Sequence, residues 1–500
     1  MKVEEVNAIQ EVDYEREKFA VVDAAQRRYL AERALHWNDV ARWTDRHRGL
    51  GSAYHRRLVA IYRFLIPAAS RVLEIGCGRG DLLAALKPAY GVGIDFSAEM
   101  IARAREDHPE IQFVQADAHA FDLVQDFDFI ILSDVVNDLW DAQTVFAQIR
   151  KLATSRTRVL LNFYNRLWEL PLAAARRLGL AKPNLDQNWF TVEDITGLLA
   201  LADFEVIRHR TDVLLPLPIP LLGAFADRYL AKIWPFSAFA LTHVLVARPV
   251  PATKQINARE KLPTVSVVVA ARNESGNIPA IFARVPELGR STELVFVEGG
   301  SLDNTYEAIQ FEMANNPHRQ SQLLKQRGKG KGDAVRLGFQ HATGELLLIL
   351  DADLTVPPED LPRFVEALVS GKTDFANGSR LVYPMEKDAM RFFNLLGNKF
   401  FSVAFSWLLG QPIKDTLCGT KALWRVDYET IAANRSYFGD FDPFGDFDLL
   451  FGAAKASMKI VDIPIRYRDR SYGETNIQRW RHGWLLLRMV VFAARRIKFI

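Results

Sequence analysis

Residues 346–353, Leu346-Leu347-Leu348-Ile349-Leu350-Asp351-Ala352-Asp353, place two acids directly after a run of five branched apolar residues. Such a run is typical of a strand buried on both faces of a parallel sheet. Ligands of open α/β sheets bind at the carboxyl ends of the strands, so we expect Asp351 and Asp353 to face one. Two close carboxylates are hard oxygen ligands, suited to Mg²⁺ or Mn²⁺ holding a diphosphate. The stretch therefore predicts an enzyme that takes a nucleotide-linked donor.

The composition is that of a globular protein of more than one domain. The chain has 500 residues, of which 49% are hydrophobic and 25% charged, and its net charge of +3 argues for no particular partner. Two cysteines, far apart in sequence, exclude a disulfide framework or a structural zinc site and fit a reducing cytoplasm. Residues 1–20 do not resemble a signal peptide, and no stretch of about 20 apolar residues predicts a spanning helix.

Strand-like segments alternate with helical patterns in each half of the chain. The first half has such segments at 72–75, 91–94, 111–114, 129–132 and 158–163, with 204–209 and 243–247 as a last pair. Alternation of this kind indicates a parallel, doubly wound sheet. Residues 249–263 are polar and bounded by prolines, and a new alternation starts at residue 265. We predict two α/β domains, 1–248 with a helical segment at 1–69 and 264–500, joined by a linker at 249–263.

A glycine-rich loop follows the first predicted strand and precedes a helix. Its sequence is Glu74-Ile75-Gly76-Cys77-Gly78-Arg79-Gly80, and glycines allow a ligand to approach the main chain. The second strand ends in Asp95, which can accept both hydroxyls of a ribose, and Asp117 with Ala118 follows the third. A dinucleotide site and a turn that only packs helix on strand are the alternatives.

These segments, with residues 133–136 after the fourth strand, resemble class I methyltransferases that use S-adenosylmethionine, over residues 45–248. The resemblance implies a Rossmann-like sheet with the cofactor held by Glu74, Gly76, Gly78, Gly80, Asp95, Asp117 and Ala118. Asp95 would hold the ribose and Asp117 would contact the adenine. The methyl acceptor stays open, because residues 162–168 and 188–190 read equally as acceptor groups or as aromatic packing. Residues 214–234 read as a buried segment, or as a hydrophobic cap touching a membrane.

In the second half, polar groups follow each strand-like segment or open a helix. They occupy residues 271–274, 298–305 and 328–334, where a base, a ribose and a diphosphate can be gripped. The segment Gly328-Lys329-Gly330-Lys331-Gly332 lacks the spacing of a Walker P-loop, which disfavours an ATPase.

This constellation resembles family 2 glycosyltransferases of the GT-A fold, closest to those that act on polyprenyl phosphates, over residues 264–482. The resemblance implies that Asp351 and Asp353 bind the metal. It implies that the donor is bound by Arg272, Asn273, Glu274, Glu298, Ser301, Asp303, Lys331, Gly332, Asp351 and Arg470. The segment Asp415-Thr416-Leu417-Cys418-Gly419-Thr420-Lys421 resembles a conserved loop of the family, which implies that Asp415, Gly419 and Lys421 lie on the acceptor side. Glu298 replaces the usual Asp, and Asn476 replaces a usual Lys.

The predicted catalytic residues are Asp353, through the metal, and Asp446 or Asp448 as a base for a sugar hydroxyl. A lipid phosphate acceptor is already ionised, and the acid would then only orient it. The alternative for Asp446 and Asp448 is an acidic surface or a helix cap, and for Asp351 and Asp353 a turn cap. The resemblance implies a single displacement with inversion.

Two segments could lie on a membrane surface. Residues 391–409 are amphipathic and rich in aromatics, and the basic tail interleaves arginines with Trp480, Trp484 and Phe492. Helices packed on their own domain are an equal alternative. No motif supports binding of nucleic acid.

Taken together, the sequence predicts a bifunctional enzyme. One half transfers a sugar from a nucleotide-diphosphate donor, with Mg²⁺ or Mn²⁺, to a polyprenyl phosphate or a glycan. The other transfers a methyl group from S-adenosylmethionine to an unknown acceptor. We expect a cytoplasmic protein, with peripheral contact to the inner face of the membrane left open, acting on bacterial cell-envelope carbohydrate. A binding regulator with an inactive domain and a sugar-phosphate nucleotidyltransferase are the alternatives.

Overall fold

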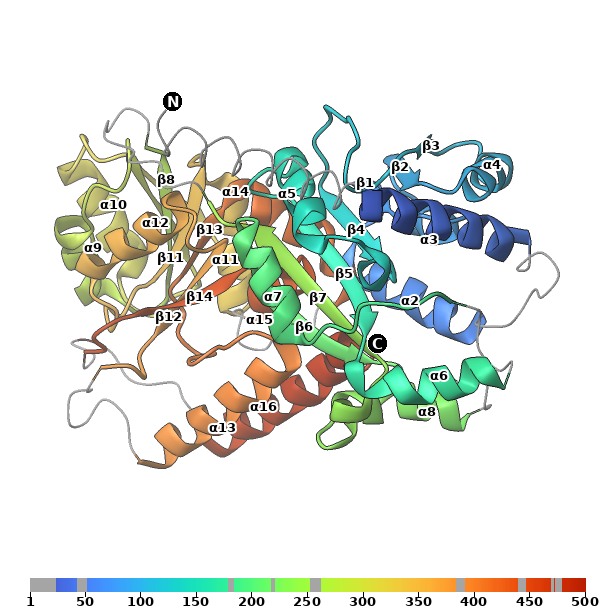
Figure 1. Cartoon of the computed structure of the whole chain (residues 1–500). Helices are drawn as coiled ribbons and strands as arrows, with labels where there is room; N and C mark the ends of the chain where they lie inside the picture. The colour runs from blue at the N-terminus through green and yellow to red at the C-terminus, as the bar shows by residue number, and fades with distance from the viewer. Residues whose placement is uncertain are drawn as a thin grey trace, which may run out of the picture. The chain divides into compact units, whose positions relative to one another are not determined.

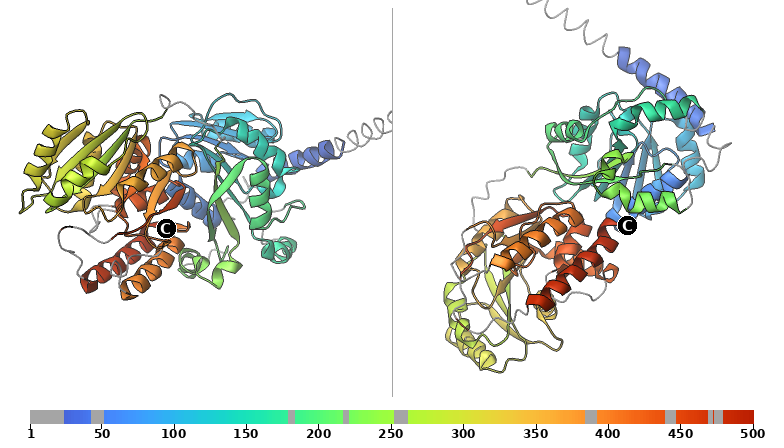
Figure 2. Two further views of the ribbon diagram at one scale, coloured as in Figure 1. Left: turned by 90° about the vertical axis from the view of Figure 1, so that its left-hand side faces the viewer. Right: turned by 90° about the horizontal axis from the view of Figure 1, so that it is seen from below.

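The chain forms two compact units, Met1–Val250 and Pro251–Ile500. The computed structural model describes residues 24–42, 52–178, 184–216, 221–251, 262–383, 392–438, 447–468, 472 and 479–500. Each unit is a twisted sheet covered by helices (Figures 1 and 2). The division falls within the segment 249–263 predicted as a linker, of which residues 252–261 lie outside the described residues. The exact boundaries 1–248 and 264–500 stay predictions.

The first unit holds a seven-stranded sheet of order β3-β2-β1-β4-β5-β7-β6. Its first five strands are parallel, β7 runs antiparallel to β5, and β6 runs antiparallel to β7. The strands are β1 Arg71–Ile75, β2 Tyr90–Asp95, β3 Gln112–Gln115, β4 Phe129–Ser133, β5 Arg158–Tyr164, β6 Phe204–Asp212 and β7 Thr242–Pro249. The predicted parallel α/β fold is confirmed.

Helices surround this sheet. They are a helix over 24–42, α2 Ser52–Leu65, α3 Asp81–Leu86, α4 Ala98–Asp107, α5 Ala142–Leu152, α6 Glu169–Arg177, α7 Val192–Leu201 and α8 Leu222–Arg228. Short 3₁₀ turns join them at η1 Val136–Asp138, η2 Arg166–Trp168, η3 Leu230–Lys232 and η4 Phe236–Phe239. The helix over 24–42 and α2 account for the described part of the helical segment predicted at 1–69.

The second unit holds a seven-stranded sheet of order β10-β9-β8-β11-β13-β12-β14. Strand β13 runs antiparallel to both of its neighbours, and the remaining pairs are parallel. The strands are β8 Val265–Ala271, β9 Thr292–Glu298, β10 Ser321–Lys325, β11 Leu346–Asp351, β12 Phe375–Ser379, β13 Lys421–Trp424 and β14 Ile460–Pro464. The helices are α9 Ile278–Arg284, α10 Thr305–Asn315, α11 Lys331–His341, α12 Leu361–Val369, α13 Phe392–Leu409, α14 Arg425–Ala433, α15 Phe447–Lys455 and α16 Arg479–Ala493.

Strand β11 is the buried strand that the opening run predicts. Residues 346–350 are all buried, and Asp351 is the first residue of the strand that is not. In register, β11 lies between β8 and β13. Because β11 is covered on both faces, its charged residue, Asp351, is the last one of the strand.

The segment between β6 and β7 is fastened to the first unit by a buried cluster of charges. The Asp212 carboxylate accepts from Arg57 at 2.7 and 3.0 Å and from Arg210 at 2.9 Å, and it lies 3.1 Å from the Lys232 Nζ. Burial acts to raise the pKa of Asp212, but the three cations outweigh it and lower the pKa to about 2. Burial lowers the pKa of Lys232 to about 7 even beside this carboxylate.

This segment is not the plain buried one that its composition favoured. Gly223, Ala226 and Ala231 are buried, but the large apolar side chains face outward, with Leu221 88% and Trp234 82% exposed. The expectation of burial for residues 214–234 is therefore wrong for the large side chains that the structure describes.

We expect Asp212→Asn to cost about 3–5 kcal/mol of the first unit's stability, because the buried Arg210 and Lys232 and the partly buried Arg57 would lose the carboxylate that they share. Differential scanning calorimetry should show one transition moved to lower temperature. Asp39→Asn is the control, since its pair with Arg42 is exposed, and should leave the melting temperature unchanged. Equal melting temperatures for wild type and Asp212→Asn would contradict the assigned role of the cluster.

Candidate active sites

The glycine-rich loop of the first unit is tied to the end of the neighbouring strand. The amides of Gly76 and Cys77 donate to the Ile94 carbonyl at 2.8 and 3.0 Å, and the Gly78 amide donates to Asp95 Oδ2 at 2.9 Å. Gly76, Gly78 and Gly80 all have positive φ, between 52° and 78°. That backbone favours glycine, and a methyl group built at Gly78 would meet nothing within 4 Å. The loop thus leaves open space against its main chain.

Asp95 joins this loop to the next helix. Its second oxygen, Oδ1, accepts from the Ser97 amide at 2.9 Å at the start of α4. In the sheet, Asp95 lies beside Gln115 at the end of β3, and Asp117 follows two residues later. The structure therefore brings Asp95, Asp117 and the loop to one edge of the sheet, as predicted.

Glu74 lies just behind the loop, on β1, and is 2% exposed. Burial raises the pKa of Glu74 to about 8. Its Oε2 has no hydrogen-bond partner among the residues that the structure describes. A buried oxygen without a hydrogen-bond partner lowers the stability of the fold. A ligand group that forms a hydrogen bond with Glu74 Oε2 would remove that penalty.

Asp117 and Ala118 lie beyond β3. Asp117 Oδ1 accepts from the His119 amide at 3.0 Å and contacts His119 Nδ1 at 2.7 Å. Burial opposes ionisation of Asp117, but the hydrogen bonds from His119 outweigh it and hold the pKa below its usual value. Ala118 is buried at 9% exposure. His119 is a partner that the sequence did not single out.

A second polar group of the first unit was partly missed from the sequence. Asp134 Oδ1 accepts from the Tyr54 hydroxyl at 2.6 Å and from Asn162 Nδ2 at 2.5 Å, and Asn162 Oδ1 accepts from the Tyr62 hydroxyl at 2.8 Å. Burial raises the pKa of both tyrosines well above the usual value. The sequence analysis used residues 133–136, which hold Asp134, for the methyltransferase resemblance, and it left residues 162–168, which hold Asn162, open between acceptor groups and packing. Their partners Tyr54 and Tyr62 lie on α2, and nothing in the sequence beyond helical spacing marks these two tyrosines as part of a site.

Hydrogen bonds within the unit hold the two aromatic segments whose role the sequence left undecided. Trp168 Nε1 donates to the Phe239 carbonyl at 2.9 Å, and Asn165 Nδ2 donates to the carbonyls of Ala238 and Ala240. Asn188 donates to the Asn137 and Leu139 carbonyls. These contacts favour the packing interpretation over an acceptor role for Trp168 and Asn188.

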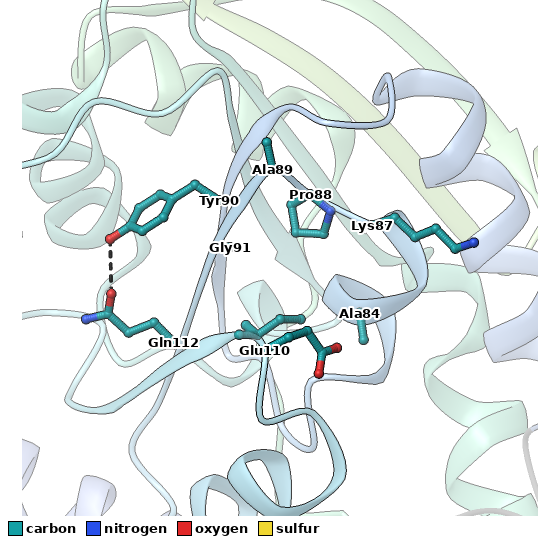
Figure 3. Close-up of a pocket in the computed structure, with 9 residues that line it drawn as sticks. Ala84, Lys87, Pro88, Ala89, Tyr90, Gly91, Glu110 and Gln112 are labelled. Carbon is teal, nitrogen blue, oxygen red and sulfur yellow. Dashed lines mark hydrogen bonds between the residues drawn. The ribbon is translucent and has the colours of Figure 1, made fainter.

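A cavity of about 360 Å³ opens at the other end of the strands of this sheet, where β2 and β3 begin (Figure 3). It is lined by the first residues of β2 and β3, Tyr90 and Gln112, and by Lys87 and Glu110. The Tyr90 hydroxyl donates to Gln112 Oε1 at 3.0 Å. No predicted site residue lines this cavity, so it is separate from the glycine-rich loop.

In the second unit, the loops after β8 and β9 are bound to each other. The Asn273 amide donates to Ser301 Oγ at 3.0 Å, and Asn273 Oδ1 accepts from the Leu302 amide at 2.7 Å. Asp303 Oδ2 accepts from the Ser275 amide at 3.2 Å. Glu298 Oε1 accepts from the Ser301 amide at 2.5 Å. The predicted donor residues of the two loops thus form one surface.

Two further predicted donor residues flank this surface. Glu274 is buried, its Oε2 accepting from Asn277 Nδ2 at 2.7 Å and its amide donating to Thr305 Oγ1. Arg272 is exposed beside them. Glu274 therefore shapes the loop after β8, and Arg272 is available to a ligand.

The predicted metal site lies at the end of β11. Asp351 Oδ1 contacts Lys331 Nζ, at the start of α11, at 2.6 Å. Burial acts to raise the pKa of Asp351, but the Lys331 ammonium outweighs it and holds the pKa below its usual value. Asp353 Oδ1 accepts from the Thr355 amide at 3.2 Å and hydroxyl at 2.8 Å. Next to Lys331, Gly332 is buried at the start of α11.

Gly419 covers the Lys331–Asp351 pair. A methyl group built on Gly419 would overlap Lys331 Nζ and both carboxylate oxygens of Asp351. Glycine suits position 419 because the main chain there lies against the Lys331 ammonium and the Asp351 carboxylate and leaves no room for a side chain. Within the described ranges no three His, Cys, Asp or Glu side chains gather as a metal cluster. Asp351 and Asp353 nevertheless fit a Mg²⁺ or Mn²⁺ ion that takes its other ligands from a diphosphate and water.

The other acceptor-side residues are buried and shape this loop. Asp415 is paired with Arg380 through two bonds of 2.7 and 2.9 Å, and the Asp415 Oδ1 also accepts from the Leu417 amide. Lys421 Nζ donates to the Cys418 carbonyl. Both residues therefore hold Gly419 in place.

The predicted base is partly described. Asp448, on α15, is buried and its Oδ2 accepts from Arg435 Nε at 2.7 Å, with Arg336 4.0 Å away. Asp446 and Arg470 lie outside the described residues. The roles of all three stay predictions.

Comparison with known proteins matches both halves. Residues 266–429 match the family model of glycosyl transferase family 2, and residues 72–155 match that of a methyltransferase domain. A curated dolichol-phosphate mannosyltransferase of Pyrococcus furiosus is 30% identical over 219 residues, which cover 43% of this chain and 59% of that protein. The chain thus spans about three-fifths of the length of this relative.

Two solved structures are similar to parts of the chain. One is the complex of the Haloferax volcanii Trm112 methyltransferase activator and a putative methyltransferase, with 17% identity and a TM-score of 0.33 over 42% of this chain and 97% of that one. The other is glucosyl-3-phosphoglycerate synthase of Mycobacterium tuberculosis with Mn²⁺, UDP and glucosyl-3-phosphoglycerate, with 18% identity and a TM-score of 0.36 over 50% and 85%.

The two sheets show a chain built from two α/β units. The first contains a segment similar to methyltransferase domains, residues 72–155, and the second a segment similar to family 2 glycosyl transferases, residues 266–429.

We expect Gly419→Ala to weaken binding of UDP or GDP with Mn²⁺ by about tenfold or more, because the new methyl group displaces Lys331 and Asp351. Isothermal titration calorimetry measures this. Gly397→Ala, on α13, is the control, since its methyl group meets nothing within 4 Å. Unchanged binding by Gly419→Ala would show that the ion pair does not serve the nucleotide.

Glu74 should make the first unit less stable as the pH rises. The native state holds a proton on Glu74 between pH 4.5 and about 8 that the unfolded state has lost, so the contribution of Glu74 to stability is greatest below 4.5 and falls through this window. Glu74→Gln should flatten the slope between pH 5 and 8 by about 1 kcal/mol per pH unit. The transition that Asp212→Asn moves identifies this unit in calorimetry.

Proposed function

We propose that the second unit transfers a sugar from a nucleotide-diphosphate donor, and that the first transfers a methyl group from S-adenosylmethionine. The observation that carries the glycosyl transfer is the Lys331–Asp351 pair under Gly419, at the end of a buried strand in a family 2 domain. The site combines the Lys331 ammonium with the Asp351 and Asp353 carboxylates, next to the polar loops after β8 and β9. A diphosphate with a divalent cation fits such a site.

The donor would lie across the ends of β8, β9 and β11. Glu298, Asp303 and Asn273 would face the nucleoside, and Lys331 would stand beside the diphosphate. A Mg²⁺ or Mn²⁺ ion held by Asp351 and Asp353 would offset the charge of the departing nucleoside diphosphate. Lys331 adds a positive charge at the same point, where the leaving group gains its negative charge.

A polyprenyl phosphate is the acceptor that we favour over a glycan. Asp448 is held by Arg435, so it would have to leave an ion pair before it accepted a proton from a sugar hydroxyl. A phosphate monoester is already ionised near neutral pH and needs no base. The P. furiosus relative, a dolichol-phosphate mannosyltransferase, is named for the same class of acceptor. Attack by the phosphate oxygen on the face opposite the leaving group would invert the anomeric centre.

In the first unit, Asp95 would accept from the ribose hydroxyls and Asp117 would contact the adenine. The unpartnered Glu74 Oε2 suits a donor group of the cofactor's methionine end. Covalent fusion supports action on related lipid-linked or surface carbohydrates of a bacterial envelope.

We propose peripheral contact of the second unit with the cytoplasmic face of the membrane. In the part of the chain that the structure describes, no helix is long and apolar enough to cross a bilayer. Helices α13 and α16 expose Phe400, Val403, Trp407 and Trp484, and Arg488 is exposed among them. Apolar and basic side chains on one surface suit anionic lipid.

Asp353→Asn should lower sugar transfer by about 100-fold or more, since it removes half of the cation's protein ligands. The assay follows release of nucleoside diphosphate from UDP- and GDP-sugars with Mn²⁺ and a polyprenyl phosphate. Glu366→Gln, an exposed carboxylate of the same unit, is the control. The thermal shift with S-adenosylhomocysteine should be the same in both variants. Release of pyrophosphate would indicate a nucleotidyltransferase, and binding without turnover a regulator.

A further inference from the structure

The first unit carries an unusual apolar surface between β5, β6 and β7. Eleven of the sixteen exposed large apolar residues in its described part lie in two segments, 166–178 and 221–239. These residues are Leu167, Leu170, Leu178, Leu221, Leu222, Phe225, Tyr229, Ile233, Trp234, Phe236 and Phe239. We call them the apolar surface. Monomeric proteins in water rarely expose so many clustered large side chains without a partner.

The two segments form one surface because hydrogen bonds join them. Trp168 Nε1 donates to the Phe239 carbonyl, and Asn165 Nδ2 donates to the carbonyls on either side of it, at Ala238 and Ala240. Figure 1 shows α6 and α8 at the same end of the unit, beyond the carboxyl end of β5.

The apolar surface is held rigidly from beneath. Lys232 on η3 reaches Asp212 at the end of β6, and Asp227 Oδ1 accepts from the amides of Leu214 and Leu215. Lys232 and Asp227 are thus engaged with the unit, whereas the large apolar side chains of 221–239 that form the apolar surface face outward. A platform fixed in this way loses little conformational freedom when it binds.

The charges around the apolar surface are mostly positive. Arg166, Arg177 and Arg228 are exposed and Arg176 is half-buried, whereas Glu169 is the one exposed acid of the described residues within 166–178 and 221–239. Two copies pairing through this surface would bring arginines against arginines, which disfavours a symmetric dimer. Anionic lipid headgroups complement the charge, and the aromatic side chains suit the bilayer interface.

We infer that the methyltransferase unit docks on an anionic bilayer through the apolar surface, with α6 and α8 lying in the interface. Helices of nine and seven residues are far too short to span the bilayer. Arg166, Arg177 and Arg228 contact headgroups, while Trp234 and Phe239 enter the acyl boundary. This contact is separate from the one proposed for α13 and α16, and it does not depend on either catalytic activity.

A site-specific probe tests the inference in the full chain. Both native cysteines, Cys77 and Cys418, are buried, so a cysteine introduced by Phe239→Cys can be labelled alone with an environment-sensitive fluorophore. With vesicles of phosphatidylcholine and phosphatidylglycerol, its emission should shift to the blue. Leu201→Cys, 68% exposed on α7, is the matched probe and should not respond.

Co-sedimentation gives the affinity. Trp234→Ser combined with Phe239→Ser should lower the fraction bound to anionic vesicles by about tenfold or more, and 0.5 M NaCl should weaken wild-type binding. Val124→Ser combined with Leu201→Ser, equally exposed elsewhere on the unit, should bind as wild type.

Three results would overturn the inference. The first is a protein that sediments with vesicles while the Phe239→Cys probe stays silent, which would assign binding to α13 and α16. The second is a dimer in solution, measured by light scattering, that Trp234→Ser with Phe239→Ser dissociates. The third is no sedimentation with anionic vesicles at all.

Discussion

A parallel strand buried on both faces has no place for a charge until it ends, and this constraint arranges both units. In β11 five buried residues precede Asp351, and in β2 four buried residues precede the Asp95 carboxylate at the strand's end. Neighbouring strands of the same direction end at the same edge, so their polar ends gather there. The Lys331–Asp351 pair and the Asp95 contacts to the glycine-rich loop are the two results.

Each sheet also contains a strand that runs the other way, and the segment before that strand lies at the edge where the neighbouring parallel strand ends. Strand β13 starts at the edge where β11 ends, so Gly419 in the preceding loop comes to lie on Asp351. Strand β7 starts where β5 ends, with Thr242 beside Tyr164. The segment that enters β7 carries the apolar surface.

Much of this could be predicted from the sequence because strand ends leave a plain signal. An apolar run followed by an acid located Asp351 and Asp95, and the glycine spacing located the loop of the first unit. Long-range partners leave no such signal. Nothing near Tyr54 indicates that it reaches Asp134, 80 residues away, or that Asp448 is held by Arg435. The apolar segment after β6 was misjudged because composition shows how apolar a segment is, and not which side faces solvent.

The loop around Gly419 and the segment between β6 and β7 both precede an antiparallel strand, and their described residues take no part in the parallel ladders of the sheets. Such a position can lengthen or change its side chains during evolution while the sheet keeps its register. Related chains could therefore diverge in the molecules they modify and still share one way of binding their activated donors.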